Sequence, residues 1–312
     1  MQPVRMSAAS RQEEDRHMIT EALLYPGMAF LAFMGFLYSG ILRKIAARMQ
    51  NRIGPPVWQP FLDFLKLLGK EDIIPEQAKP GFTFWAFMAP ASVMVAGLMV
   101  PMAGSTALPF QSNLLIIFYF LAMSSVSLYL CGFASANPFS LVGSARKITQ
   151  AVGYEFPFLL SLLVPALAAG SLNPLTISSY QAGGIWIAGV YPLAFAAFFV
   201  AMLAKTETPP FHVPGAHQEI VAGYYTEYTG TRLAFIELAH FLKLFVLISL
   251  GVALYMGGSP DILSFLLKSL GILFLVTLSR VVFARMRIDH VIRVAWLFGA
   301  IALIDLARVI LW

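Results

Sequence analysis

Residues 114–133 read Leu-Leu-Ile-Ile-Phe-Tyr-Phe-Leu-Ala-Met-Ser-Ser-Val-Ser-Leu-Tyr-Leu-Cys-Gly-Phe, a run of twenty residues without a charge. A helix that crosses the hydrocarbon core of a bilayer needs about 20 residues of this kind. The whole chain of 312 residues shares this character, because 59% of its residues are hydrophobic and only 12% are charged. Such a composition excludes a pair of soluble domains. We therefore expect a membrane protein.

Seven further apolar segments have lengths that suit a bilayer crossing, so the sequence predicts an all-α, polytopic fold with about eight transmembrane helices. Residues 1–20 form a polar lead without the apolar core of a signal peptide, and residues 21–312 are expected to form one membrane domain. The further segments lie at about 22–42, 85–101, 151–169, 185–203, 233–256, 262–283 and 294–312.

The loops between these segments differ sharply in charge. The loops near 102–113, 170–184 and 257–261 contain no lysine or arginine, whereas each of the others contains at least two of these residues. Since basic loops stay on the cytoplasmic side, this pattern predicts a protein of the cytoplasmic (inner) membrane with both termini outside. It also explains the net charge of +5 without nucleic acid as a partner. The predicted cytoplasmic loops are about 43–84, 134–150, 204–232 and 284–293.

The first of these loops is long and contains an apolar pattern of its own. Phe61, Phe64, Leu65 and Leu68 share one helical face, which is typical of an amphipathic helix on the membrane surface. Arg48 and Arg52 lie four residues apart before Gly-Pro-Pro, and their planar guanidinium groups suit docking of a soluble subunit. Asp63 with Lys66, and Asp289 with Arg285 or Arg293, are expected to form structural ion pairs.

Ionisable residues also occur inside the predicted spans, where a charge costs at least ~2.5–3.5 kcal/mol. Glu237 and His240 share a helix face, so we expect them to point into one cavity. An alternative is a buried ion pair of Glu237 with Lys243 or Arg232 that only locks helix packing. For Lys268 and Asp305 such a pair, or extension of the side chain toward the interface, is favoured. The candidate ion pathway comprises Glu155, Glu219, Glu227, Glu237, His240 and Lys243.

Motifs in all four charged loops resemble the subunit-1 family of respiratory complex I. This family includes the membrane subunit of group 4 membrane-bound nickel–iron hydrogenases and related ferredoxin-driven complexes. The motifs are Arg48-Met-Gln-Asn-Arg-Ile-Gly-Pro-Pro56, Lys70-Glu-Asp-Ile-Ile-Pro75, Gly132-Phe-Ala-Ser135, Tyr154-Glu155, Glu207-Thr-Pro-Pro-Phe211, Thr226-Glu227-Tyr228 and the Arg-x-Arg-x-Asp run that begins at Arg285.

The resemblance implies a subunit that connects a soluble electron-transfer arm to antiporter-like membrane subunits and couples electron flow to H⁺ or Na⁺ pumping through buried glutamates. Such a subunit is not catalytic by itself. It has no cofactor of its own, and the nickel–iron centre and the iron–sulfur clusters belong to partners that resemble hydrogenase large and small subunits. The expected interface with that arm comprises Arg48, Arg52, Gln59, Asp63, Arg146, His212, His217, Arg285, Arg287, Asp289 and Arg293.

Two departures from the quinone-reducing members point to the hydrogenase-type branch. Residues 212–217 read His-Val-Pro-Gly-Ala-His, where those members have an acidic run, and the first loop is short between Gly54-Pro-Pro and Gln59. In addition, Leu42 precedes Arg43 where the quinone enzymes have a glutamate. The alternatives are the quinone-site subunit of an NADH or other quinone oxidoreductase, a sulfur-reducing relative and, more remotely, a stand-alone transporter. A quinone therefore stays an alternative ligand.

Overall fold

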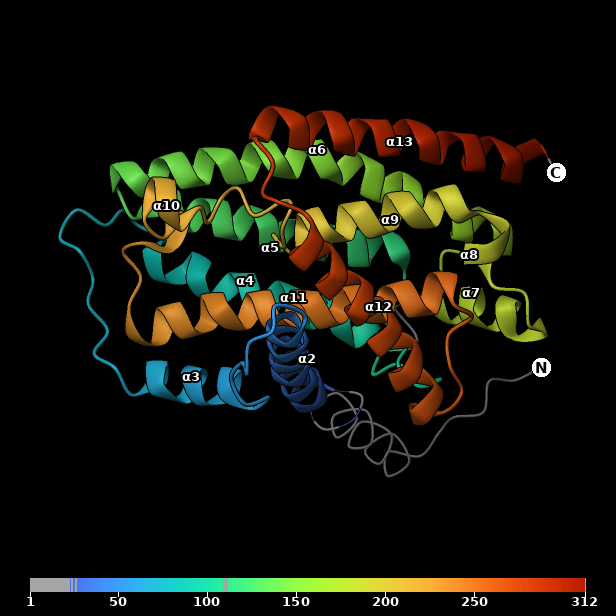
Figure 1. Cartoon of the computed structure of the whole chain (residues 1–312), viewed down its shortest axis with the longest axis horizontal. Coiled ribbons are helices and arrows are strands. Elements are labelled where there is room, and N and C mark those ends of the chain that lie inside the picture. The colour runs from blue at the N-terminus through green and yellow to red at the C-terminus, as the bar shows by residue number, and fades with distance from the viewer. Residues whose placement is uncertain (1–22, 24, 26, 109–111, 312) are drawn as a thin grey trace, which may run out of the picture.

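The computed structural model of the chain describes residues 23, 25, 27–108 and 112–311, and within them the chain is helical without a β-strand (Figure 1). This confirms the all-α prediction. In these ranges, seven helices are long and apolar enough to cross a membrane. They are α2 (Met28–Met49), α4 (Phe82–Met99), α5 (Leu114–Ala134), α6 (Pro138–Ala169), α11 (Gly230–Tyr255), α12 (Ile262–Val282) and α13 (Ile288–Leu311). The predicted polar lead at residues 1–20 lies outside the described residues.

The fifth predicted span differs from the expectation. Residues 185–203 do not form one long helix, because the backbone leaves the helical conformation at Tyr191 and Pro192 starts a new helix. Proline lacks the N–H that a continuing helix requires but is tolerated at the first helical position. The result is a short α8 (Ile187–Val190) followed by α9 (Pro192–Lys205), a shorter apolar helix of 14 residues. Before them lie α7 (Pro174–Tyr180) and η2 (Gln181–Gly183).

Helix α6 begins earlier than predicted. Residues 138–150 were expected in a loop, but they form the first turns of a helix of 32 residues. Asn137 caps this helix, since its side-chain oxygen accepts a hydrogen bond from the backbone N–H of Phe139 at 2.8 Å, and Pro138 occupies the first position. Both features are strong helix-start signals. The basic residues of the third predicted loop therefore lie on a helix.

Helix α11 lies inside the bundle and packs against α2, α3, α4 and α12. In its most apolar window, 78% of the residues are buried. Figure 1 shows α4, α5, α6, α9, α11 and α13 running roughly along the long axis, whereas α2 and α12 cross them. The connection between α3 and α4, together with α10 and the first turns of α6 and α11, lies at one end of the bundle, which we call the loop end.

The predicted surface helix is present as α3 (Gln59–Leu68) and packs on α2 and α11. Phe64 contacts Phe36, with ring centroids 5.2 Å apart. The other apolar residues of the predicted face, Phe61, Leu65 and Leu68, are exposed to the surroundings. The face is thus packed on the protein at Phe64 and exposed at the other three positions.

The segment between α9 and α11 contains α10 (His217–Ile220) and η3 (Gly223–Tyr225), and it packs closely on α6. Gly143 makes this approach possible, because a Cβ atom there would lie 2.6 Å from the backbone nitrogen of Tyr224. Tyr228 fixes the end of the segment, since its hydroxyl donates to the carbonyl oxygens of Phe82 and Cys131. This packing brings the segment against the buried face of α6.

Candidate functional site

A buried ion pair joins α6 to the segment that follows α9. The ammonium group of Lys147 donates to the carboxylate of Glu207, and the side chains are 1% and 5% exposed. Glu207 has a backbone φ of 53°, an uncommon left-handed conformation for a residue other than glycine. The chain therefore turns sharply where α9 ends, and the turn places the carboxylate against α6.

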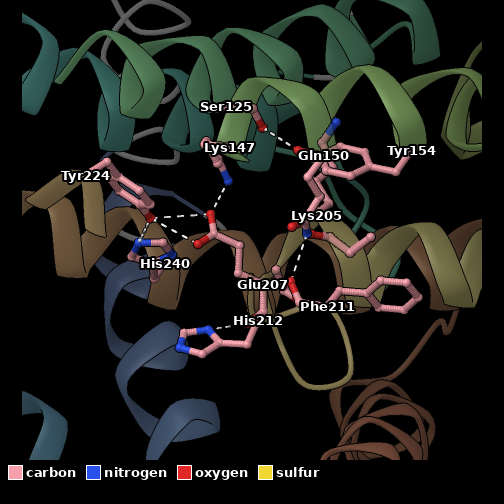
Figure 2. A network of polar contacts seen from close by, with 12 residues as sticks. Ser125, Lys147, Gln150, Tyr154, Lys205, Glu207, Phe211, His212, Tyr224 and His240 are labelled. Carbon is pink, nitrogen blue, oxygen red and sulfur yellow. Dashed lines mark hydrogen bonds and ion pairs between the residues drawn. The ribbon is translucent and has the colours of Figure 1, made fainter. Parts of the chain in front are cut away.

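The same carboxylate continues into a chain of contacts (Figure 2). The hydroxyl of Tyr224 lies 3.2 and 3.3 Å from the two oxygens of Glu207. It also lies 2.9 Å from Nε2 of His240 on α11. Lys147, Glu207, Tyr224 and His240 thus connect three separate parts of the chain through polar atoms.

The electrostatics of Glu207 follow from this environment. Burial alone raises the pKa of a carboxyl group, but the nearby ammonium group of Lys147 outweighs it and lowers the pKa of Glu207 to about 2. Burial raises the pKa of Tyr224, and the negative charge of Glu207 adds to that effect. At neutral pH the site therefore contains an ionised carboxylate and a neutral phenol.

A second ion pair lies deeper along α6. Nζ of Lys205, at the end of α9, is fully buried and donates to both carboxylate oxygens of Glu155 at 2.7 and 2.8 Å. Aromatic rings surround the ammonium group, which lies 4.6 Å from the ring centroid of Phe158 and 5.3 Å from that of Tyr154. Such rings stabilise a cation through their negative faces.

Gln150 positions the two ion pairs relative to each other. Its side-chain nitrogen donates to the carbonyl oxygens of Ala204 and Phe211, at 2.8 and 3.0 Å. These carbonyls flank Lys205 and Glu207 in the chain, so Gln150 holds the turn between them (Figure 2). Lys147, Gln150 and Tyr154 are spaced by three and four residues, which puts them on one face of α6.

A partly open cavity of about 250 Å³ adjoins the first ion pair. Glu207, Tyr224, Glu237 and His240 all line it. Sequence reasoning expected Glu237 and His240 to face one cavity, and the structure places both there. Arg43 and Arg280 contribute further positive charge to its wall.

The two predicted partners of Glu237 are Arg232 and Lys243. Arg232 binds Asp72 at 2.6 Å and the hydroxyl of Thr83 at 2.9 Å. Lys243 is fully buried, and within the described part of the chain its Nζ has no hydrogen-bond partner. The buried pairs that do form, Lys147 with Glu207 and Lys205 with Glu155, involve two lysines that the sequence pattern had suggested only as orientation signals.

The remaining predicted ion-pathway residues lie at the loop end. Glu219 on α10 is exposed and is held by Arg146 and Arg285, each at 2.5 Å. The hydrogen bond from Arg146 lowers the pKa of Glu219. Glu227 accepts a hydrogen bond from Asn137, the residue that caps α6. The structure therefore connects both glutamates to α6 but not directly to the buried pairs.

The predicted docking residues also lie in loops and at helix ends. Arg48, Arg52, Arg287 and Arg293 are exposed, His212 contacts the backbone carbonyl of Glu207 at 2.9 Å, and the side chain of His217 lies outside what the structure describes. Two predicted ion pairs are wrong, because each aspartate binds a different residue. Asp63 binds Gln59 and Arg43 rather than Lys66. Asp289 binds Arg287 rather than Arg285 or Arg293.

Sequence reasoning missed Lys147, Lys205, Glu207 and Tyr224 as members of a buried network. The spacing of Lys147, Gln150 and Tyr154 on one helix face was a usable signal, but only if α6 was known to begin at Pro138. Nothing in the local sequence shows that Glu207 turns toward α6. Within the described residues there is also no group of three or more His, Cys, Asp and Glu side chains that could hold a metal ion.

The fold and the site define a polytopic α-helical membrane protein with buried ion pairs beneath a charged loop end. A sequence model of the NADH dehydrogenase family matches residues 22–310. Subunits H of the NADH-quinone oxidoreductases of Bacillus thuringiensis (strain Al Hakam) and Bacillus cereus (strain AH187) are each 34% identical over 302 residues, covering 89% of this chain and 90% of theirs. The chain belongs to this family, that of subunit 1 or H of complex I, and is a membrane subunit of a complex-I-like complex.

A solved structure of the membrane-bound sulfane sulfur reductase, an archaeal respiratory membrane complex, has the same fold. It superposes with a TM-score of 0.87 and 24% identity, covering 94% of this chain and 99% of that one. The family resemblance predicted from the loop motifs is thus confirmed. As a subunit of a multi-subunit respiratory complex, the chain is accompanied by other redox and membrane subunits.

Proposed function

We propose that this chain couples electron transfer in a docked redox arm to the movement of H⁺ or Na⁺ across the membrane. The observation that carries this proposal is that two ion pairs, Lys147–Glu207 and Lys205–Glu155, are buried in a chain that crosses a bilayer. Buried ion pairs are costly to desolvate and are weak contributors to stability. Ionisable groups at membrane depth more often line ion or proton pathways.

The pathway begins at the cavity and ends at Glu155. Water in the cavity reaches Glu207, Glu237 and His240, which line its wall. Tyr224 joins His240 to Glu207, and the turn held by Gln150 leads to Lys205 and Glu155. A charge or conformational change at the loop end shifts the Glu207 turn, and this shift changes the proton affinity of the second pair.

The loop end supplies the docking surface for the redox arm. Arg146, Arg285 and Arg287 line a further cavity of about 460 Å³ around Glu219. Arginine suits such an interface because its planar guanidinium group forms paired hydrogen bonds with carboxylates. In our proposal this end faces the cytoplasm, both termini lie outside, and the partners resemble hydrogenase large and small subunits and antiporter-like membrane subunits.

For the terminal acceptor we propose the hydrogenase type, with reduced ferredoxin as donor and the metal centres in the partners. Two features support this assignment. His212 stands where an acidic run is expected and binds the backbone of the Glu207 turn. The cavity of about 250 Å³ is also smaller than the ~300–1,000 Å³ common for small-molecule sites.

Quinone reduction is the second candidate. The relatives with 34% identity are named for quinone, and Arg43 and Arg280 add polar donors to the cavity wall. The intact complex, purified through a tag on this chain, separates the two candidates. Formation of H₂ from reduced ferredoxin without quinone reduction supports the hydrogenase type. Quinone reduction without H₂ assigns the cavity to quinone. Reduction of polysulfide alone assigns the complex to the sulfur-reducing relatives.

Coupling itself is tested with the complex in sealed vesicles, by measuring ions moved per electron transferred. Glu207→Gln keeps the shape of the side chain but removes its charge, and we expect it to abolish ion movement while electron transfer continues. Glu76→Gln is the matched control, since Glu76 is exposed in the first loop. Normal coupling in the Glu207 variant would contradict the proposal.

A further inference from the structure

Lys243 is the least satisfied charged side chain of the buried site. It is fully buried in the middle of α11, and its Nζ has no hydrogen-bond partner among the residues that the structure describes. Buried polar atoms in proteins almost always have a partner. An isolated buried ammonium ion is far more costly than an isolated neutral amine. The contrast with Lys147 and Lys205, which each bind a carboxylate, therefore calls for a physical reason.

Lys243 interacts electrostatically with members of both ion pairs. It lies three residues after His240, so the two side chains share a face of α11 and Lys243 is about 4.5 Å farther along the helix axis. His240 contacts the Tyr224 hydroxyl, which contacts Glu207. Electrostatic interactions of Lys243 extend to Lys147 and Glu207 of the first pair and to Lys205 and Glu155 of the second.

The two carboxylates that interact electrostatically with Lys243, Glu207 and Glu155, are already bound by other lysines. A third carboxylate, Glu237, lies six residues earlier on α11 itself and lines the cavity. Of the other helices packed on α11, α4 and α8 have no ionisable side chain, α5 carries only Tyr119, Tyr129 and Cys131, and α7 carries only Tyr180. α2 brings Tyr38, Arg43, Lys44 and Arg48, α3 brings Asp63 and Lys66, and α12 brings Lys268 and Arg280. Asp63, the one carboxylate among them, is bound by Arg43.

A second unsatisfied atom lies in the same region. Oε1 of Gln150 is buried and has no hydrogen-bond partner in the described ranges, and it lies on the face of α6 that also carries Lys147 and Tyr154. Unpaired buried polar atoms are the usual partners of internal water. A region with an unpaired donor and an unpaired acceptor is suited to transient hydration, which a moving proton requires.

We propose that Lys243 is an uncharged amine in the resting protein and the intermediate proton acceptor between the Lys147–Glu207 and Lys205–Glu155 pairs. This inference rests on the proposed coupling function and deepens it by naming the relay residue. The amine binds one proton that enters from water in the cavity and becomes an ammonium ion. The same proton leaves toward the second pair, which restores the amine, so no other bond changes.

Two substitutions separate this role from a structural one. Lys243→Met removes the amine but fills a similar apolar volume, and Lys243→Arg introduces a charge that cannot be lost at accessible pH. Lys268→Met is the control, because Lys268 is a lysine of a neighbouring helix whose ammonium group binds the carbonyls of Met256 and Gly258 and lies over the ring of Trp186. Ions moved per electron, electron-transfer rate and assembly are measured for the intact complex in vesicles.

We expect both Lys243 variants to assemble and transfer electrons, and both to lose at least about tenfold in ions moved per electron, a modest loss for a proton-transfer group. The control should couple normally. The number of ions that the wild-type complex moves per electron should also depend on pH, and neither variant should show this dependence. Normal coupling in Lys243→Met, or retention of coupling by Lys243→Arg, would overturn the proposal, because reversible protonation would then be unnecessary. Failure of Lys243→Met to assemble would also overturn it, by showing a structural cation.

The same experiment distinguishes this inference from the coupling function on which it rests. Glu207→Gln and Glu155→Gln are measured in parallel. If these variants lose coupling while Lys243→Met keeps it, only the role of Lys243 is wrong. If the glutamate variants also couple normally, the coupling function itself is wrong.

Discussion

Lys205 and Glu155 form an ion pair between the end of α9 and the middle of α6, with Nζ 2.7 and 2.8 Å from the two carboxylate oxygens. The lysine is fully buried and the glutamate side chain is 20% exposed. The lysine therefore depends on this carboxylate for its charge, whereas the glutamate has some access to the surroundings. A pair of this kind is suited to pass a proton onward when the charge near the lysine changes.

Removal of one member of this pair should be more harmful than removal of both. Lys205→Met leaves the Glu155 carboxylate without its partner, and Glu155→Gln leaves a buried ammonium ion. Breaking a buried pair costs about 3–5 kcal/mol, whereas replacing both members is often neutral. We expect each single variant to lower the thermal midpoint of the purified complex and the double variant to recover most of the loss. Additive losses in the double variant would show that the two residues do not stabilise each other.

Gly143→Ala should disturb the first ion pair without touching a charged residue. The added Cβ would lie 2.6 Å from the backbone nitrogen of Tyr224 and 2.8 Å from the backbone of Gly223. Because backbone atoms cannot move aside cheaply, we expect a loss of about 1–3 kcal/mol in stability. Displacement of η3 should also separate Tyr224 from Glu207 and reduce coupling. Ala145→Gly, at an exposed position of the same helix, is the control for a change of helix propensity.

The stability of the protein should depend on pH through Glu207. Its pKa is lowered to about 2 in the folded protein, below the value of about 4.3 in an unfolded chain. The ionised carboxylate therefore stabilises the fold above about pH 4.3, and this contribution is lost as the pH falls through about 2. Thermal midpoints of the wild-type complex should fall more steeply over this range than those of Glu207→Gln. Parallel curves would contradict the assignment.

The contact of Arg285 with Glu219 should affect docking of the soluble arm more than folding. Glu219 is exposed and is bound by Arg146 and Arg285, and exposed ion pairs contribute only ~0–1 kcal/mol to stability. We expect Arg285→Ala to leave the thermal midpoint nearly unchanged. The soluble arm should, however, dissociate at lower salt concentration, because fewer positive charges face it. Retention of the arm on an affinity column, measured over increasing salt, checks this expectation. Unchanged salt resistance would remove Arg285 from the docking surface.

Most helices of the fold could be predicted because they depend on the local pattern of apolar residues. The apolar segments predicted the spans, and the spacing of Phe61, Phe64, Leu65 and Leu68 predicted α3. The start of α6 was missed although Asn137 and Pro138 form a helix-start signal, because the basic residues that follow resembled a loop. The break before α9 could have been found from Pro192 alone.

The partners of charged residues were harder to predict than the helices. Asp63 and Lys66 have the right spacing for a helical pair, yet the tertiary fold brings Arg43 to Asp63 instead. Lys147 and Lys205 resembled orientation signals because sequence alone does not show burial. Their carboxylates come from residues 60 and 50 positions away in the chain. Only the packed structure decides such contacts.

The most direct test of the account compares Glu155→Gln, Glu207→Gln and the double variant in the intact complex, in sealed vesicles, by ions moved per electron transferred. If the two buried pairs form one relay, each single variant should abolish coupling while electron transfer persists, and the double variant should be no worse than either single one. Full coupling in both single variants, with the complex assembled and electron transfer intact, would contradict the central claim.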